Sequence, residues 1–325
     1  MPHPMTVLMP TRLSPFLIDT LDKATTLVRL WEAPDQAALL DEVGSTIRGI
    51  ACGAHAVVDA ALMARLPALE IVANFGVGYD AVDTRYAAGH GIMVTHTPDV
   101  LNEEVADTTL ALILNTVRQF PAAERHVRSG AWVGGAFPLS DSLRGRTVGI
   151  LGLGRIGKAI ATRCEAFGLA VAYHGRNAQP AVPYLFHPTL LGLAAASDIL
   201  VVIAPGGAAT RNLVDAAVLK ALGPEGYLIN VARGTVVDEA ALIDALHNNT
   251  IAGAGLDVFA DEPRVPEALI GMDHVVLLPH VGSASRHTRQ AMDQLVADNL
   301  TSWAAGAGPL TPVPETPWPR DRSGA

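Results

Sequence analysis

An arginine, a glutamate and a histidine in the last third of the chain are the residues best suited to chemistry. Arg233 follows the apolar run 227–230, Glu262 follows the run 255–258, and His280 follows the run 275–278. Each run predicts a strand, and ligands bind beyond the carboxyl ends of the strands in open parallel sheets. Arginine can hold a carboxylate through two parallel hydrogen bonds, and histidine can exchange a proton near neutral pH. With a glutamate to orient the histidine, the three residues suit the chemistry of 2-keto acids.

A glycine-rich motif, Gly152-Leu-Gly154-Arg-Ile-Gly157, predicts a dinucleotide site. It directly follows the apolar run 147–151 and opens a helical pattern over residues 155–167, which is the context that the fingerprint requires. The missing side chains let a pyrophosphate approach the backbone N–H groups at the helix start, including those of Arg155 and Ile156. In other contexts the pattern would be weak, because a chain with 30 glycines can produce it by chance.

The end of the next strand predicts which cofactor binds. An NAD site places an acidic residue about 20 residues into the unit, on the ribose 2′-hydroxyl. Here the chain has no Asp or Glu between Glu165 and Asp198, and Arg176 follows the strand. An arginine attracts a 2′-phosphate and can bond it at two points, so we expect NADP(H).

The composition of the chain limits the classes of protein to which it can belong. The 325 residues suggest two domains, and a hydrophobic content of 50% with 17% charged residues indicates globular structure. The net charge is −9 and no Lys/Arg-rich run occurs, so no nucleic-acid partner is expected. Cys52 and Cys164 show neither metal-site nor disulfide spacing, so no metal is expected. The chain has no apolar run of about 18 residues, so we expect no membrane span. We expect a cytoplasmic protein.

Strand and helix patterns alternate along the chain, which predicts an α/β fold with parallel sheets. We expect two Rossmann-like domains: a doubly wound cofactor domain, and a smaller flavodoxin-like substrate domain. The substrate domain would comprise residues 1–98 and 286–325, and the dinucleotide-binding domain residues 99–285. The final helix, over 289–303, would return to the substrate domain, and the proline-rich end from 309 would be extended or mobile. Expected strands are residues 6–9, 26–30, 49–52, 71–74 and 92–95, then 147–151, 170–173, 199–204, 227–231, 252–257 and 275–278.

Several motifs together resemble the D-isomer-specific 2-hydroxyacid dehydrogenases, over about residues 57–303. The form of three of them is similar to the NADPH-dependent glyoxylate/hydroxypyruvate reductase branch: the Phe-Gly-Val-Gly-Tyr-Asp segment, the Pro-Gly-Gly loop and Arg176. The motifs are Asn74-Phe-Gly-Val-Gly-Tyr-Asp80, Gly152–Gly157, Ala204-Pro-Gly-Gly207, Asn230-Val-Ala-Arg-Gly234, Gly255-Leu-Asp-Val-Phe259 with Glu262-Pro263, and Pro279-His-Val-Gly-Ser283.

The resemblance implies catalytic roles for three residues. Arg233 would bind the substrate carboxylate and position the keto oxygen. His280 would protonate that oxygen as hydride reaches C2, and Glu262 would bond His280. The products would be D-2-hydroxy acids, made from small 2-keto acids such as glyoxylate and hydroxypyruvate.

The resemblance also implies binding roles. The backbone N–H groups of Val77 and Gly78 would bind the carboxylate, and Asp257 would contact the nicotinamide amide. Pro205, in the Pro-Gly-Gly loop, would line the cofactor site. Trp132 matches a tryptophan that reaches the neighbour's active site in this branch, which implies a homodimer.

The sequence is also compatible with other functions. A reductase of phenylpyruvate or hydroxyphenylpyruvate in the same family would share the mechanism. The pocket expected to select the substrate's R group is formed by Gly53, Ala54, His55, Tyr79, Trp132 and Phe137. A cofactor-sensing binding protein, a formate or phosphite dehydrogenase and a phosphoglycerate dehydrogenase are less favoured, because of Arg176 or the chain length. His96 stands where the family's pattern has asparagine, and we attach no function to the change.

Overall fold

The computed structural model describes residues 4–53 and 56–319, and the chain divides into two compact units. The first unit comprises Met1–Leu101 and Arg286–Ala325, and the second is Asn102–Ser285. The chain therefore passes from one unit to the other twice, after Leu101 and after Ser285. Two of the residues expected in the substrate pocket, Ala54 and His55, lie outside the described residues.

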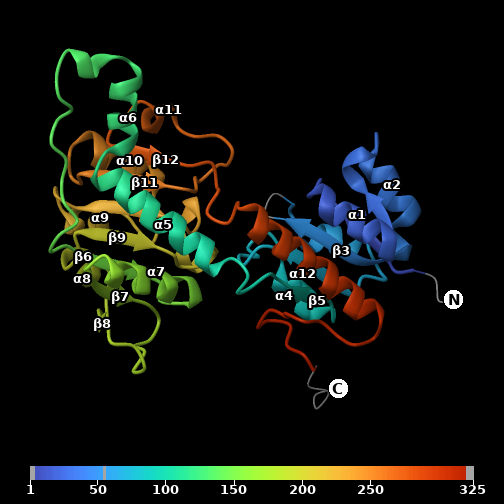
Figure 1. Ribbon diagram of the computed structural model, residues 1–325. Coiled ribbons are helices and arrows are strands. Elements are labelled where there is room, and N and C mark those ends of the chain that lie inside the picture. The colour runs from blue at the N-terminus through green and yellow to red at the C-terminus, as the bar shows by residue number, and fades with distance from the viewer. Residues whose placement is uncertain (1–3, 54–55, 320–325) are drawn as a thin grey trace. The chain divides into compact units, whose positions relative to one another are not determined.

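Within its described residues, the first unit contains a five-stranded parallel sheet in the order β2-β1-β3-β4-β5 (Figure 1). This is the flavodoxin-like order, as expected from the sequence. The strands are β1 (Thr6–Met9), β2 (Thr26–Arg29), β3 (Ile47–Gly53), β4 (Ile71–Phe75) and β5 (Met93–Thr95).

Helices cover both faces of this sheet. Val7 and Met9 of β1 pack with α1 and α12 on one face, and Leu8 packs with α2, α3 and α4 on the other. This alternation follows from the two-residue period of a strand. Side chains of Ser14 and Asp59 accept backbone N–H bonds at the starts of α1 and α3. The helices are α1 (Pro15–Ala24), α2 (Gln36–Val43), α3 (Ala60–Ala64), α4 (Thr84–Gly89) and α12 (Arg286–Ala304), with short 3₁₀ turns η1 (Leu30–Glu32) and η2 (Gly44–Thr46).

The C-terminal segment is fastened to β5. Pro312 forms an antiparallel bridge with Thr95, and the N–H of Val313 donates to Val94 O at 2.9 Å. The N–H of Val94 in turn donates to Thr316 Oγ1 at 3.0 Å. Of the two alternatives expected for the proline-rich end, extended or mobile, the structure has the extended one at Pro312, which pairs with β5, and Val313 next to it is buried.

The second unit, whose residues are all described, contains a seven-stranded parallel sheet in the order β12-β11-β10-β9-β6-β7-β8. This is a doubly wound arrangement that reverses direction between β6 and β9. Six of its strands were expected, and β8 was missed because two residues cannot show a strand pattern. The strands are β6 (Thr147–Leu151), β7 (Ala170–His174), β8 (Leu185–Phe186), β9 (Ile199–Val202), β10 (Tyr227–Asn230), β11 (Gly253–Leu256) and β12 (Val275–Leu277).

Apart from α6, the helices of the second unit bury apolar side chains. Asp215 and Asp238 cap α9 and α10 by accepting backbone N–H groups of the first turn. The helices are α5 (Asn102–Val117), α6 (Phe120–Arg128), α7 (Arg155–Ala166), α8 (Leu190–Ala195), α9 (Ala216–Leu222), α10 (Glu239–His247) and α11 (Glu267–Ile270), with 3₁₀ turns η3 (Ala131–Val133), η4 (Ala208–Thr210) and η5 (Gly234–Val236).

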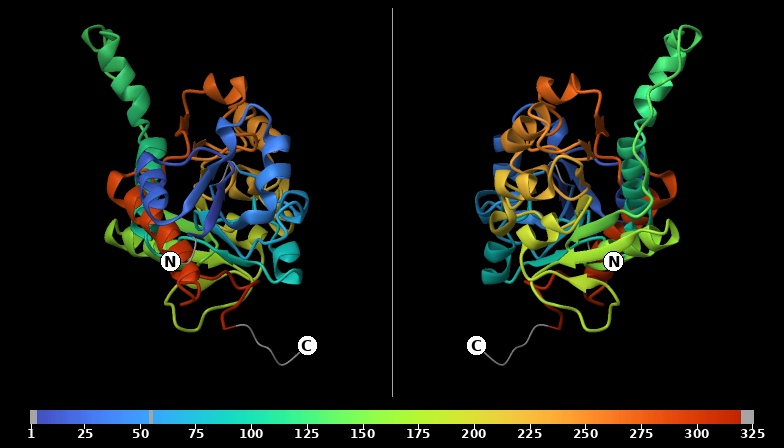
Figure 2. Two further views of the ribbon diagram at one scale, coloured as in Figure 1. Left: turned by 90° about the vertical axis from the view of Figure 1, so that its right-hand side faces the viewer. Right: turned by 90° about the vertical axis from the view of Figure 1, so that its left-hand side faces the viewer.

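Helix α6 and the turn η3 form an arm that projects from the second unit (Figure 2). No residue of α6 is buried, and residues 130–142 form the return of this arm. Among the described residues of the whole chain, none of the helices is long and apolar enough to cross a membrane.

Candidate active site

The glycine-rich turn lies at the carboxyl end of β6, at the point where the strand order reverses. Gly152 has φ +103°, and a Cβ there would lie 2.9 Å from the backbone N of Ala204. A Cβ on Gly157 would lie 2.3 Å from Gly152 O, whereas a Cβ on Gly154 would meet nothing within 4 Å. Two glycines therefore allow close packing, and Gly154 leaves the start of α7 open.

This open helix start fits the pyrophosphate of a dinucleotide. Arg155 and Ile156 are the first residues of α7, and the N–H groups of a first helical turn have no partner within the helix. They present a partial positive charge to an anion. Pro205, expected in the same site, follows β9, the strand next to β6, and its carbonyl accepts a hydrogen bond from Thr210 Oγ1 at 2.7 Å.

Arg176 lies in an exposed loop that follows β7, and this loop is tied back to the glycine turn. The N–H of Gln179 donates to the hydroxyl of buried Tyr173 at 2.6 Å. The Gln179 side chain donates to Leu153 O, within the glycine turn, at 2.8 Å. Gln179 thus fixes the Arg176 loop relative to the turn. Sequence reasoning missed this residue, because its contacts depend on loop closure and follow no spacing.

Arg233 follows β10 in a turn that its neighbours define. Asn230 Nδ2 donates to Arg233 O at 3.0 Å, and Asn230 Oδ1 accepts the N–H of Ala232 at 3.1 Å. A Cβ on Gly234 would lie 1.8 Å from the carbonyl carbon of Phe259. Glycine is therefore required here, and it lets the turn with Arg233 lie directly against the loop that carries Glu262.

Glu262 bridges its own loop and His280. Its Oε1 accepts the N–H of Phe259 at 3.1 Å, and its Oε2 lies 2.7 Å from His280 Nδ1. Burial opposes ionisation of Glu262, but the hydrogen bond and charge of His280, the Phe259 N–H and the charge of Arg233 together lower its pKa. The structure thus brings the three predicted residues together, with an ionised carboxylate between an arginine and a histidine.

The bond to Glu262 fixes the chemistry of the His280 ring. A carboxylate accepts, so Nδ1 carries the proton that is shared with Oε2. Nε2 is then the nitrogen that can exchange a proton with a substrate. The backbone is constrained as well: His280 has φ +54°, and its N–H donates to Asp257 O at 2.9 Å.

Asp257 is 2% exposed and holds the turn that follows His280. Its two carboxylate oxygens accept the N–H groups of Val281 at 2.7 Å and Gly282 at 2.8 Å. Burial raises the pKa of Asp257, and these two hydrogen bonds offset that effect incompletely. Contact of this carboxylate with the nicotinamide amide stays a prediction.

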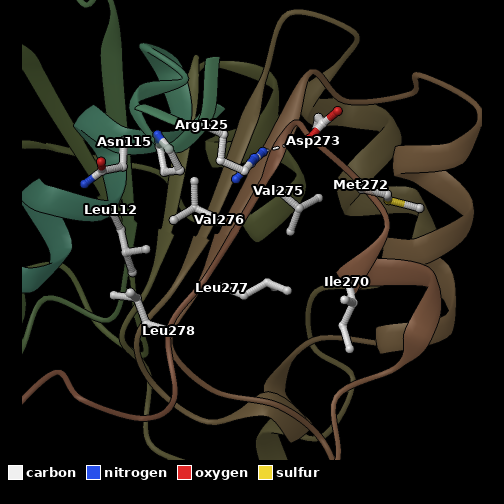
Figure 3. Close-up of a pocket in the computed structure, with 11 residues that line it drawn as sticks. Leu112, Asn115, Arg125, Ile270, Met272, Asp273, Val275, Val276, Leu277 and Leu278 are labelled. Carbon is white, nitrogen blue, oxygen red and sulfur yellow. Dashed lines mark hydrogen bonds and ion pairs between the residues drawn. The ribbon is translucent and has the colours of Figure 1, made fainter. Parts of the chain in front are cut away.

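The other predicted residues lie apart from this cluster in the chain. Val77 and Gly78 follow β4 in the first unit. Trp132 lies in the arm of the second unit and is 66% exposed, so its own chain leaves most of the indole uncovered. A groove of about 500 Å³ runs between the arm and β12 (Figure 3), and it contains none of the predicted site residues.

Comparisons with known proteins show the family of the chain. Residues 110–282 match the family described as D-isomer specific 2-hydroxyacid dehydrogenase, NAD binding domain. A glyoxylate/hydroxypyruvate reductase from Arabidopsis thaliana is 48% identical over 307 residues, 94% of this chain and 98% of that protein. A hydroxyphenylpyruvate reductase from Plectranthus scutellarioides is 45% identical, with the same coverage.

A solved structure is similar over the whole chain. It is the NADPH-dependent glyoxylate/hydroxypyruvate reductase from Sinorhizobium meliloti in complex with NADP and malonate. Its sequence is 55% identical, the match covers 98% of this chain and 99% of that chain, and the TM-score is 0.93.

Proposed function

Because the chain belongs to the D-isomer specific 2-hydroxyacid dehydrogenase family, we propose that it uses NADPH to reduce small 2-keto acids, such as glyoxylate and hydroxypyruvate, to D-2-hydroxy acids. The observation that carries this proposal is the cluster of Arg233, Glu262 and His280, with Glu262 Oε2 bonded to His280 Nδ1 at 2.7 Å. The names of the relatives support the choice of small 2-keto acids.

His280 is the proton donor in this proposal. Reduction turns the C2 carbonyl into an alcohol, so its oxygen gains negative charge and must take up a proton as C2 accepts hydride. His280 Nε2 gives that proton, and Glu262 Oε2 holds the imidazole in place through Nδ1. Proton transfer from a positioned side chain contributes roughly 100- to 10,000-fold to a rate. The sum is 2-keto acid plus NADPH plus H⁺ to 2-hydroxy acid plus NADP⁺.

Arg233 and the first unit bind the substrate. The guanidinium of Arg233 attracts the substrate carboxylate and the developing oxyanion. The electrostatic stabilisation that a cation gives to an oxyanion is stronger where water is excluded. The N–H groups of Val77 and Gly78 bind the same carboxylate. In this proposal the first unit is the substrate-binding domain and the second is the dinucleotide-binding domain.

The second unit binds NADP(H). When bound, the reduced nicotinamide supplies the hydride. Gly152, Gly154 and Gly157 would shape the pyrophosphate site at the start of α7, Arg176 would bond the 2′-phosphate, Pro205 would line the site, and Asp257 would contact the nicotinamide amide. The absence of an acidic residue beside Arg176 supports NADP(H) over NAD(H), since a carboxylate would repel the 2′-phosphate.

We propose a homodimer as the working state. The arm has no buried residue in α6, and Phe120, Val127 and Val133 on it are exposed. Burial of such side chains against a second copy of the chain would remove apolar surface from water, and a two-fold axis would make the contact reciprocal. In this arrangement Trp132 contributes to the partner's active site. The free, buried cysteines Cys52 and Cys164 fit a cytoplasmic location.

The second candidate is reduction of larger aromatic keto acids, which the hydroxyphenylpyruvate reductase relative favours. The test is oxidation of NADPH with glyoxylate, hydroxypyruvate and phenylpyruvate side by side, repeated with NADH. A higher kcat/KM for glyoxylate or hydroxypyruvate with NADPH supports the main proposal. A higher value for phenylpyruvate moves the substrate to the aromatic class, and no turnover with any of the three contradicts both.

A further inference from the structure

We propose that His96 is a positioning residue for substrate binding, which aims the N–H group of Gly78 at the substrate carboxylate. The inference rests on the proposed function, because that function places the carboxylate at Val77 and Gly78. It assigns a role to a residue that differs from the family's asparagine, a difference to which the sequence alone attached no function.

Three successive carbonyl groups of the loop after β4 are held within the first unit. Gly76 O accepts the N–H of Thr97 at 3.0 Å and Asn74 Nδ2 at 3.2 Å. Val77 O lies 3.1 Å from His96 Nδ1. Gly78 O accepts a second bond from Asn74 Nδ2 at 3.0 Å. Three successive carbonyl directions are thereby fixed.

Fixing a carbonyl also fixes the next N–H. In a planar trans peptide the C=O of one residue and the N–H of the next point in opposite directions. The bonds to Gly76 O therefore direct the N–H of Val77, and the bond from His96 to Val77 O directs the N–H of Gly78. Among the described residues, neither of these two N–H groups donates a hydrogen bond, so both are available to a ligand.

The hydrogen bond from His96 to Val77 O also makes the N–H of Gly78 a stronger donor. A peptide whose carbonyl accepts a hydrogen bond is polarised, and its N–H becomes a better donor to an anion. A carbonyl can only accept, so the His96 Nδ1 that faces Val77 O carries a proton. An imidazole is thus used as a fixed donor, with its direction set by the backbone around it.

The C-terminal segment holds His96 in place. The N–H of His96 donates to Thr311 O at 3.2 Å, and His96 O accepts Thr311 Oγ1 at 2.6 Å. The ring of Tyr79 lies edge-on to the imidazole at 5.5 Å, and the Tyr79 hydroxyl donates to Glu315 at 3.1 Å. Residues 310–316 therefore support the loop that binds the carboxylate.

The chain offers a conservative variant and a matched control. In asparagine Nδ2 is bonded to Cγ, as Nδ1 is in histidine, so His96→Asn keeps a donor in the same place. His96→Leu removes it. His90 in the same unit also has its Nδ1 on a backbone carbonyl, that of Tyr86 at 2.9 Å, but its loop has no proposed substrate contact.

The test is steady-state kinetics with NADPH and glyoxylate, together with inhibition by oxamate, an unreactive 2-keto acid mimic, and the Kd for NADPH. We expect His96→Leu to raise KM and the oxamate inhibition constant about 5- to 10-fold, the loss of roughly one hydrogen bond. The kcat and the NADPH Kd change much less, His96→Asn restores KM to within about 2-fold, and His90→Leu behaves as wild type.

Unchanged KM and oxamate inhibition in an active His96→Leu enzyme would overturn this inference and leave the proposed function intact. A wild-type chain that reduces no 2-keto acid would overturn the proposed function, and this inference with it. If His96→Leu fails to fold, Thr311→Val carries the test, because it removes the hydroxyl bond to His96 O. An increase in KM with unchanged NADPH affinity supports the proposal, and unchanged KM overturns it.

Discussion

Glu262 Oε2 and His280 Nδ1 lie 2.7 Å apart, at the ends of two neighbouring strands of one parallel sheet. Because Glu262 occupies Nδ1, Nε2 is the nitrogen of His280 to which we assign the proton transfer, and the charge of Arg233 helps to keep Glu262 ionised. The pair and the arginine come from segments far apart in the sequence, and parallel strands with a common carboxyl edge bring them together.

Removal of the Glu262 charge should slow the reaction without loss of the cofactor. Glu262→Gln keeps the shape of the side chain but weakens its bond to His280, so we expect kcat to fall about 10- to 100-fold, in the range of orienting partners. The NADPH Kd should stay within about 2-fold of wild type. Steady-state kinetics and fluorescence titration measure the two effects.

The matched control is Glu239→Gln. Glu239 Oε2 accepts the N–H of Ala260 at 3.1 Å, so it also holds the loop, but through a backbone group and without a bond to the His280 ring among the described residues. Equal losses of kcat in both variants would show that the carboxylates act by holding the loop, and would contradict the role given to Glu262.

The lowered pKa of Glu262 predicts how stability depends on pH. A carboxylate whose pKa is lower in the folded state stabilises the fold above its ordinary pKa, about 4.3, and this contribution is lost as pH falls through the folded value. The free energy of unfolding of wild type should exceed that of Glu262→Gln by a constant amount near neutral pH. The difference should shrink below about pH 4.3.

Urea unfolding of both proteins at a series of pH values measures this difference. Asp257 is present in both, and burial, the main cause of its raised pKa, is the same in both; the charge of Glu262 is a smaller cause. A difference that grows as the pH falls would contradict the direction assigned to Glu262.

Arg176 should determine cofactor preference. Loss of its bonds to the 2′-phosphate costs about 1.5–3 kcal/mol per charged hydrogen bond, which is roughly 10- to 100-fold in affinity. We expect Gly175→Asp with Arg176→Ser to lower kcat/KM for NADPH by this factor and to raise it for NADH. Lys220→Gln, an exposed cation on α9, is the control. An unchanged ratio of NADPH to NADH would refute the assignment.

Much of this fold follows from the sequence. The apolar runs of β1 and β6 were located to the residue, and placement after strand ends singled out Arg233, Glu262 and His280. Helix α6 was missed although its sequence is amphipathic, and none of its residues is buried within its own chain. Strand β8 is two residues long. The contacts of Gln179 and His96 depend on how loops close, which residue spacing does not encode.

Gly234 predicts a large effect on stability. A Cβ at this position would lie 1.8 Å from the Phe259 carbonyl carbon, so Gly234→Ala must push two site loops apart. We expect the free energy of unfolding to fall by about 1–3 kcal/mol or more, as is typical of overpacked sites, and activity to be lost.

Gly89→Ala is the matched control, since a Cβ there meets nothing within 4 Å and the residue lies in α4. Alanine favours a helix over glycine, so this variant should be equal to wild type or slightly more stable. Equal stability of Gly234→Ala and wild type in urea unfolding would rule out the close approach of the two loops.

The proton donor is the central claim, and single-turnover reduction of glyoxylate by His280→Asn tests it most directly. Enzyme saturated with NADPH is mixed with glyoxylate, and the loss of reduced cofactor is followed alongside the NADPH Kd. We predict a rate at least about 100-fold below wild type, the lower value for general acid catalysis, with NADPH binding retained. A variant that binds NADPH and reduces glyoxylate at the wild-type rate would contradict the role of His280.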